Sequence, residues 1–550
     1  MLFKEVLLRE LKRRGIKNIF GVPGRENEKI LFNEVEGIDF ITTRVEFTAG
    51  IAADMSGRLD YEPQVAFSTM GPGATNMTTA VASAMLNKSP VIFLTSQLES
   101  NDNFYNVTHQ CVDQTSIFKP ITKWSHEISN PAELPEVIEK AFEIIMTEPV
   151  GPVHIAIPTD FFCQDINVTY DLNKPIKHEV IIPNDASNKT TEINAIYNLL
   201  EASENPICLL GQEIRRANAV EEVQSFCNNW QIPFITAANM KGISNFHTDP
   251  LNYGSASCYM EGIIHYPALE EMFKHTDVII LIGYQYVDDL LPKMWAYGDS
   301  KQIILINNVE DKKIEEIIKP EIYNYGSIKE FFIKLNELKP HVKDSKSIEN
   351  IKDIYKNFDG RTTTQVENSL NPLEVVHVIN NHLEDGFLIT DIGYYRHHAI
   401  LFSQPNTVGR FFSDTGISSF GSGLPSAIAA QVNNRDKNVF LICGDGGFHS
   451  GSGDLATLVK YNLPVVVILL NNASFELINL YQSKNKKEDN EDIVALSNVD
   501  FVKLAEANGC YGKKVSNVEE LDKVLASFDR SRPLLIEASL QYTDNFEISF

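Results

Sequence analysis

A glycine-rich turn and an asparagine pair, each placed after an apolar run, form the pattern with the clearest chemical meaning. Gly444-Asp445-Gly446 follows one run, and Asn472 lies 27 positions after Asp445, at the end of the next run. Because the carboxyl ends of adjacent parallel strands meet at one edge of a sheet, we expect both groups there. The Asp445 carboxylate, the Asn472 amide oxygen and the Ser474 backbone carbonyl would then form an all-oxygen site suited to Mg²⁺ and a phosphate ligand.

The glycines of this turn suit a diphosphate. Gly444, Gly446 and Gly447 let the backbone approach such a group, and the helix expected after them offers free N–H groups. The alternative is a tight strand-to-helix turn beside an ordinary asparagine pair, since short glycine motifs recur by chance. The same plan of apolar strand, glycine turn and small-residue helix start recurs in residues 64–76, which include Gly71.

The elements that must position these residues are predicted from many short apolar runs separated by helix-like stretches. Such runs are typical of parallel strands buried on both faces, which predicts an α/β fold throughout. Polar stretches near 165–190 and 339–371 have the composition of linkers. We therefore expect three consecutive domains at 1–165, 190–340 and 365–550, each with a mainly parallel sheet flanked by helices.

Composition limits the classes of partner. The 550 residues include 48 Lys and Arg against 73 Asp and Glu, a net charge of −25. This excess argues against nucleic acid or an acidic membrane surface, but not against a small-molecule anion held locally. Seven scattered cysteines without a CxxC pair favour the reduced cytoplasm. No apolar run approaches the roughly 18–20 residues that cross a bilayer, so we expect no membrane association.

Together with further segments of the chain, this pattern resembles that of a known enzyme family. The Gly-Asp-Gly turn and its spacing to Asn472 resemble thiamine-diphosphate (ThDP) enzymes of the acetolactate synthase superfamily. The other segments that occur in the same order as in that family are 21–24, 71–76, 148–153 and 423–430. The resemblance covers essentially the whole chain and implies pyrimidine-binding, central and diphosphate-binding domains, in that order. It also implies ThDP and Mg²⁺ as cofactors, with Asp445, Asn472 and Ser474 as metal ligands.

The resemblance gives Glu46, in the segment 44–54, the role of the activating glutamate. A carboxyl group bonded to the pyrimidine ring favours the imino tautomer, whose nitrogen can deprotonate the neighbouring thiazolium carbon. Without the family, Glu46 would be interpreted as a solvated carboxylate at a helix start. Gly71 and Ser419 are likewise assigned to cofactor binding, and Phe420 to the apolar wedge that bends the cofactor; ordinary core packing is the alternative for Phe420.

Glu46 and Asp445 belong to different predicted domains. In the resembling family one cofactor contacts both positions across two subunits, which implies a homodimer with two equivalent sites. A homotetramer is also compatible with the resemblance.

Five further residues bear on the substrate. Gln110 matches the glutamine of acetolactate synthases, whereas His109 and Arg396 resemble carboxyethylarginine synthases. A histidine could transfer a proton, and a guanidinium could hold a carboxylate or phosphate. Tyr259 and Tyr542 also resemble active-site tyrosines of that synthase. Each has an ordinary alternative: a solvated His, a paired surface Arg or a half-buried Tyr.

The favoured hypothesis is a ThDP- and Mg²⁺-dependent transferase or lyase of carboxyethylarginine-synthase type, joining a triose phosphate to arginine or a similar amine. The alternative is a 2-oxo-acid enzyme, either an acetolactate synthase or a decarboxylase acting on pyruvate-like acids. A non-catalytic ThDP-binding homologue is a third hypothesis. The central run 207–210 leads to Gly211-Gln212 without a GxGxxG turn, so FAD is not expected.

Overall fold

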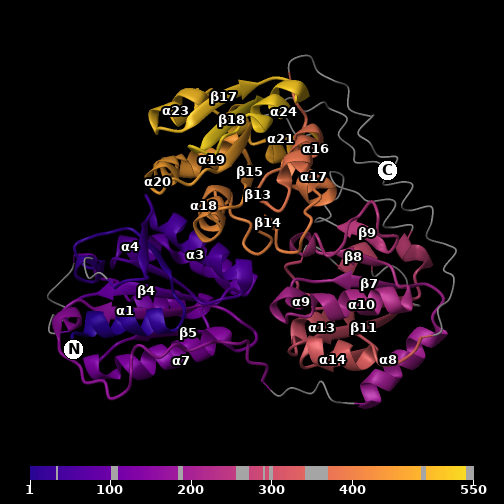
Figure 1. The fold of residues 1–550 in the computed structure, drawn as a ribbon, viewed down its shortest axis with the longest axis horizontal. Helices are drawn as coiled ribbons and strands as arrows, with labels where there is room; N and C mark the ends of the chain where they lie inside the picture. The colour runs from indigo at the N-terminus through magenta and orange to yellow at the C-terminus, as the bar shows by residue number, and fades with distance from the viewer. Residues whose placement is uncertain are drawn as a thin grey trace. The chain divides into compact units, whose positions relative to one another are not determined.

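The computed structural model contains three six-stranded sheets, and every pairing between their neighbouring strands is parallel (Figure 1). The predicted α/β class is therefore confirmed. The structure describes residues 1–31, 35–100, 109–183, 190–255, 272–288, 292–295, 301–340, 369–484 and 491–540. Within these ranges no helix is both long enough and apolar enough to span a membrane.

The first sheet has the strand order β2-β1-β3-β4-β6-β5. Its strands are β1 (Asn18–Gly21), β2 (Asp39–Thr42), β3 (Gln64–Ser68), β4 (Val91–Gln97), β5 (Trp124–Glu127) and β6 (Val153–Pro158). Its main helices are α1 (Phe3–Arg13), α3 (Glu46–Asp60), α5 (Thr78–Asn87) and α7 (Leu134–Met146). Val65 and Phe67 pack in the core formed with α1 and α7, whereas Phe93 approaches Gly50 of α3. Helices thus cover both faces, which explains the almost entirely apolar central strands.

The middle sheet has the order β12-β11-β10-β7-β8-β9, so that the strand order reverses between β7 and β10. Its strands are β7 (Pro206–Leu210), β8 (Phe234–Thr236), β9 (Asn252–Ser255), β10 (Val278–Ile282), β11 (Gln302–Asn307) and β12 (Ile322–Tyr325). Its main helices are α8 (Thr190–Ala202), α10 (Val220–Trp230), α13 (Lys312–Ile318) and α14 (Ile328–Leu335). Alternate residues of β10 enter two separate cores, since Ile279 belongs to one and Ile280 to the other.

The third sheet has the order β14-β13-β15-β16-β18-β17, the same pattern as the first. Its strands are β13 (Phe387–Thr390), β14 (Phe411–Ser413), β15 (Val439–Gly444), β16 (Val466–Asn471), β17 (Tyr511–Val515) and β18 (Leu534–Ser539). The helices used below are α16 (Pro372–Leu383), α17 (Tyr395–Phe402), α18 (Gly423–Asn433), α19 (Asp445–Gly451), α20 (Leu455–Lys460) and α21 (Glu476–Lys484). β3 and β15 hold equivalent places in the two sheets, which accounts for the sequence similarity between residues 64–76 and 438–450.

The chain divides into two compact units. The first contains residues 1–181, 416–435 and 451–463, and the second contains 182–415, 436–450 and 464–550. The predicted bounds of the three domains, 1–165, 190–340 and 365–550, remain predictions.

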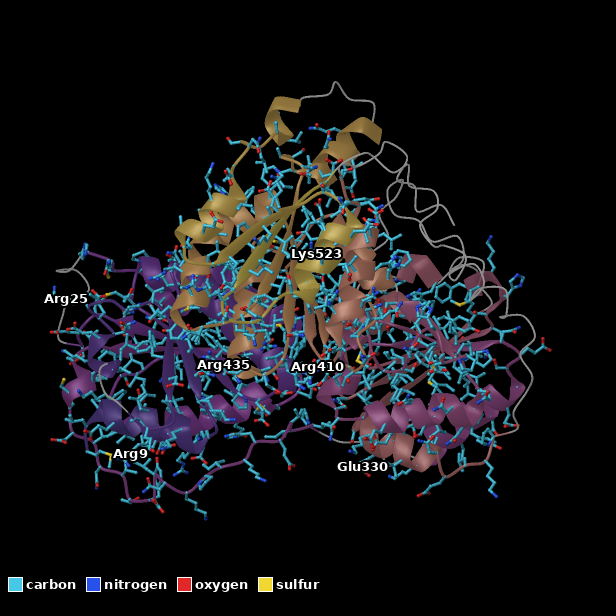
Figure 2. The ribbon with its side chains drawn as sticks, turned by 45° about the horizontal axis from the view of Figure 1, so that its top comes forward. Arg9, Arg25, Glu330, Arg410, Arg435 and Lys523 are labelled. Atoms are coloured by element: carbon cyan, nitrogen blue, oxygen red, sulfur yellow. The ribbon has the colours of Figure 1, made fainter. Side chains whose placement is uncertain are left out.

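Within the first unit, α18 packs against α3, where small residues allow close approach. Asn433 Nδ2 donates to Ser56 Oγ across this contact at 2.9 Å. Arg435, labelled in Figure 2, donates to the carbonyl of Tyr461 at 2.6 Å. Side-chain hydrogen bonds thus join α18 to α3, and residues 416–435 to residues 451–463, within the first unit.

Candidate active site

Glu46 is the first residue of α3, in the first unit. Its side chain is partly exposed, and Oε2 accepts a hydrogen bond from Asn76 Nδ2 at 3.1 Å. A Cβ added to Gly73 would lie 3.5 Å from Glu46 Oε1, so the turn after β3 passes close to the carboxylate. The N-terminal end of a helix stabilises a negative charge at this position. The helix start and the glycine turn together present one oriented carboxylate at the edge of the sheet.

Asn76 is a residue that the sequence did not assign. The family resemblance includes the segment 71–76 but implies no role for Asn76. The hydrogen bond to Glu46 shows that Asn76 orients the carboxylate. Its position at the end of the short helix α4 (Pro72–Asn76), directly after the glycine turn, is the signal that could have identified it.

Gly71 and Gln110 lie against each other in the same unit. Gly71 has a φ of 60°, and a Cβ there would approach Gln110 Cβ to 2.7 Å. Only glycine fits such a close approach combined with a left-handed φ. His109, beside Gln110, is exposed. The structure thus brings Gly71 and Gln110 together, while the proton-transfer role of His109 stays a prediction.

The segment with the proposed wedge, Ser419 and Phe420, also belongs to the first unit. The Phe420 side chain is 54% exposed, so it does not occupy the core as the packing alternative required. A phenyl ring with this exposure could contact a bound apolar group. The wedge role and the binding role of Ser419 remain predictions.

Asp445 begins α19 in the second unit, directly after β15. β15 pairs in parallel with β16, with Gly444 opposite Leu470, so Asp445 and Asn472 follow their strands at one edge of the sheet. Asp445 Oδ1 accepts from the Gly446 N–H at 2.9 Å. Burial raises the pKa of Asp445, against the stabilising backbone N–H groups of Gly446, Ala473 and Ser474. Asp445 and the turn that contains Asn472 and Ser474 are therefore close together, as predicted.

The surroundings of Asp445 fit a bound cation. Asp445 is buried, and within the described residues its Oδ2 has no hydrogen-bond partner. A cation beside a buried carboxylate would offset the desolvation that disfavours its charge. No group of three or more His, Cys, Asp or Glu side chains suited to a metal gathers in the described ranges. A cation here would thus depend on one carboxylate, neutral oxygens and ligand phosphate, as Mg²⁺ commonly does.

The two asparagines differ in how their amides are used. Asn471 donates to Glu537 Oε1 at 3.1 Å and accepts from the Ala473 N–H at 3.1 Å. Asn472 donates through Nδ2 to Glu476 Oε2 at 2.7 Å, which orients its amide. The geometry therefore favours Asn472 over Asn471 as an oxygen ligand, in agreement with the predicted choice.

Ser474 forms an isolated antiparallel bridge with Ala495. The hydrogen bonds of this bridge come from its neighbours, Phe475 N to Val494 O and Leu496 N to Ala473 O. In such a pair the N–H and C=O groups of the central residues point away from the partner strand. The Ser474 carbonyl is accordingly directed away from Ala495, as a metal ligand in this turn requires.

Arg396 lies on α17 and is buried, and its Nη1 donates to the backbone carbonyl of Asp414 at 3.2 Å. Its burial excludes the surface position that the ordinary alternative required. Burial lowers the pKa of His397 well below its usual value and that of His398 to about 4, so both rings are neutral at pH 7. Tyr259 and Tyr542 lie outside the described residues.

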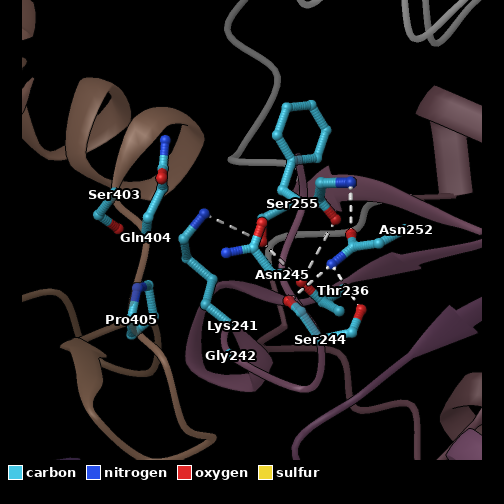
Figure 3. Close-up of a pocket in the computed structure, with 12 residues that line it drawn as sticks. Thr236, Lys241, Gly242, Ser244, Asn245, Asn252, Ser255, Ser403, Gln404 and Pro405 are labelled. Carbon is cyan, nitrogen blue, oxygen red and sulfur yellow. Dashed lines mark hydrogen bonds between the residues drawn. The ribbon is translucent and has the colours of Figure 1, made fainter. Parts of the chain in front are cut away.

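A small cavity next to α17 is lined in part by a buried lysine, Lys241 (Figure 3). Lys241 Nζ donates to the carbonyl of Ile400 at 2.7 Å, near the C-terminal end of α17. Burial lowers the pKa of Lys241 to about 7. A cation at this end of a helix offsets its dipole and satisfies its last carbonyls, so we interpret Lys241 as a helix cap.

Three family models match successive parts of the chain. They describe the N-terminal TPP binding domain (residues 1–117), the central domain (193–335) and the C-terminal TPP binding domain (391–538) of thiamine pyrophosphate enzymes. A probable acetolactate synthase large subunit from Methanocaldococcus jannaschii is 30% identical over 97% of this chain and 91% of its own length. The chain belongs to the thiamine pyrophosphate enzyme family. The acetolactate synthase of Bacillus subtilis is 26% identical over 99% of this chain and 94% of its own length. The acetolactate synthase large subunit of Lactococcus lactis is 26% identical over 98% and 93%.

These relatives correct one prediction for this thiamine pyrophosphate enzyme. The favoured carboxyethylarginine-synthase function is wrong, because these three relatives, which match nearly the whole chain, are named acetolactate synthases, the stated alternative. That prediction depended on His109, Arg396, Tyr259 and Tyr542. In the structure His109 is exposed and Arg396 donates to a main-chain carbonyl. Neither the exposure of His109 nor this hydrogen bond of Arg396 is specific to a triose phosphate or an amine acceptor.

Proposed function

We propose that this thiamine pyrophosphate enzyme is an acetolactate synthase, which joins two molecules of a 2-oxo acid such as pyruvate with loss of one carbon dioxide. The observation that carries the proposal is the Methanocaldococcus jannaschii relative, 30% identical across 97% of the chain. The oriented Glu46 carboxylate and the Asp445 turn support an active enzyme rather than a non-catalytic homologue.

Glu46 and Asn76 have distinct roles in the proposed reaction. Bound ThDP supplies a nucleophilic carbon that adds to a carbonyl and then stores electrons released on bond cleavage. Glu46 would hold the pyrimidine ring by a hydrogen bond and exchange a proton with it. Asn76 would keep the Glu46 carboxylate in the orientation that the structure shows.

The turn after β15 and the turn after β16 would hold the other end of the cofactor. Asp445, Asn472 and the Ser474 carbonyl would bind Mg²⁺, and the backbone of residues 444–447 would approach the diphosphate. The exposed ring of Phe420 would contact the bent cofactor and keep water from it. A homodimer or homotetramer and a cytoplasmic location are parts of the same proposal.

Product analysis tests this function directly. The purified chain would be incubated with ThDP, Mg²⁺ and carbon-13-labelled pyruvate, and the products identified by NMR. We expect acetolactate from the wild type and none from Glu46→Gln. Glu136→Gln, the same change at an exposed position in the first turn of α7, is the matched control and should retain wild-type activity.

Two results would contradict the proposal. Acetaldehyde without acetolactate would indicate a simple decarboxylase, because the second carbonyl is then not used as acceptor. No pyruvate consumption by cofactor-loaded, folded protein would exclude pyruvate chemistry altogether.

A further inference from the structure

A buried carboxylate, Asp454, contacts both flanks of the residue assigned to cofactor activation. Asp454 Oδ1 accepts from the backbone N–H of Arg44 at 2.9 Å, and Oδ2 accepts from Thr48 Oγ1 at 2.6 Å. Arg44 lies two residues before Glu46 and Thr48 two residues after it. Asp454 and Thr48 are each 1% exposed, so water does not compete for these bonds. One side chain thus fixes the entry into α3 from both sides of Glu46.

The Asp454 side chain does not cap the helix that it precedes. It occupies the N-cap position of α20, where an aspartate ordinarily accepts backbone N–H groups of its own helix. In the structure its side chain makes no such bond. Within its own segment it accepts only from a side chain, Thr457 Oγ1, at 2.6 Å. The carboxylate is instead turned toward α3, which lacks a side-chain cap at its own N-cap residue, Val45.

The same segment, 451–463, also holds the strand that leads into α3. The Tyr461 hydroxyl accepts from the Thr42 N–H at 2.7 Å and donates to the Phe40 carbonyl at 3.1 Å. Both partners belong to β2, which ends at Thr42. Asp454 and Tyr461 together hold the end of β2, the connection to α3 and the first turn of α3. Only the side-chain torsions of Glu46 are then left to vary.

We propose that Asp454 is a positioning residue for Glu46, holding the first turn of α3 so that the carboxylate meets the pyrimidine ring in one geometry. The proposal rests on the proposed role of Glu46 in cofactor activation. Hydrogen bonds to a buried carboxylate are strong and directional, and Arg44 N and Thr48 Oγ1 bracket Glu46 within one turn. Loss of either partner leaves the helix formed but lets its first turn move.

Cofactor activation without substrate provides the test. Exchange of the thiazolium C2 proton of bound ThDP with deuterium, quenched in acid and measured by NMR, reports on activation alone. Asp454→Asn and Thr48→Val should slow this exchange about tenfold, since small displacements of reacting groups cost large factors in rate. ThDP affinity by calorimetry should stay close to wild type, and Thr48→Ser, which keeps the hydroxyl, should restore fast exchange.

Ser56→Ala is the matched control. It removes one partly buried hydrogen bond between α3 and α18, ten residues from Glu46. It should lower the unfolding temperature about as much as Thr48→Val while exchange stays at the wild-type rate. Wild-type exchange in Thr48→Val, or equal slowing in Ser56→Ala, would overturn the proposal. If Asp454→Asn does not fold, the three variants at Thr48 and Ser56 decide.

The outcome is separable from the proposed function. Fast exchange in the wild type without acetolactate formation would reject the acetolactate synthase activity but leave the Asp454 comparison valid. Wild-type exchange no faster than in free ThDP would overturn both.

Discussion

At the scale of single residues, a few side chains carry the proposed chemistry, and each is held by a neighbour. Glu46 accepts from Asn76 at 3.1 Å, and Asn472 donates to Glu476 at 2.7 Å. Asp445 is held on one side only: Oδ1 accepts from the Gly446 N–H at 2.9 Å, whereas the buried Oδ2 has no partner within the described residues. Buried polar atoms of this kind cost stability unless a ligand satisfies them.

Glu46→Gln should abolish activation but not binding. The amide keeps the shape of the side chain but cannot exchange a proton with the pyrimidine ring, so turnover should fall at least about 100-fold. Calorimetry should give ThDP affinity within a few fold of wild type. Unchanged turnover would remove Glu46 from the mechanism.

Asp445→Asn should weaken cofactor binding and stabilise the apoprotein. Removing the negative charge should lower Mg²⁺ and ThDP affinity together, at least about tenfold, because the two bind as one assembly. Burial raises the pKa of Asp445 in the folded state, so its charged form destabilises the apoprotein as the pH rises. The unfolding free energy of the apoprotein at pH 7, measured with urea, should therefore be higher in the variant. Wild-type metal affinity would refute the ligand role.

At the scale of elements, the site depends on where strands end. The edge after β15 and β16 could be predicted, because apolar runs followed by Gly-Asp-Gly and Asn-Asn show both strand ends in the sequence itself. Asn76 and Asp454 could not be assigned, since their importance comes from hydrogen bonds between segments 30 and 406 positions apart. The exposure of Phe420 could not be predicted either, because the sequence does not show whether an apolar side chain in a turn faces the core or the solvent.

His154 connects three strands of the first sheet and gives a pH prediction. Its ring hydrogen-bonds Thr95 Oγ1 on β4 at 2.8 Å and Ser125 Oγ on β5 at 2.9 Å. Burial lowers its pKa to about 3. Between pH 6.5 and 3 the unfolded chain binds this proton and the folded one does not, so stability falls as the pH falls.

Lowering the pH from 7 to 5 should therefore cost about 2 kcal/mol through His154. Urea unfolding at the two pH values measures this loss, and in His154→Gln it should be smaller by that amount. An identical loss in the variant would show that His154 is not its source.

At the scale of the whole molecule, the first and third sheets share one strand order and supply equivalent turns. Gly71 follows β3 and Asp445 follows β15, strands that hold the same place in their sheets. A repeated sheet topology thus accounts for two glycine turns that are both assigned to the cofactor. The middle sheet has a different order and contributes no predicted cofactor ligand in the described residues, and the expectation that it binds no FAD remains a prediction.

The ThDP-loaded protein should sediment as a homodimer or homotetramer. Closed two-fold assembly gives two equivalent sites from one chain type. Analytical ultracentrifugation with and without ThDP and Mg²⁺ measures the assembly. A fully active monomer would contradict this part of the proposal.

The ratio of carbon dioxide released to pyruvate consumed tests the central claim most directly. An acetolactate synthase uses one pyruvate as donor and a second as acceptor, so we predict one carbon dioxide for every two pyruvates. A ratio of one to one, with acetaldehyde accumulating, would contradict the claim.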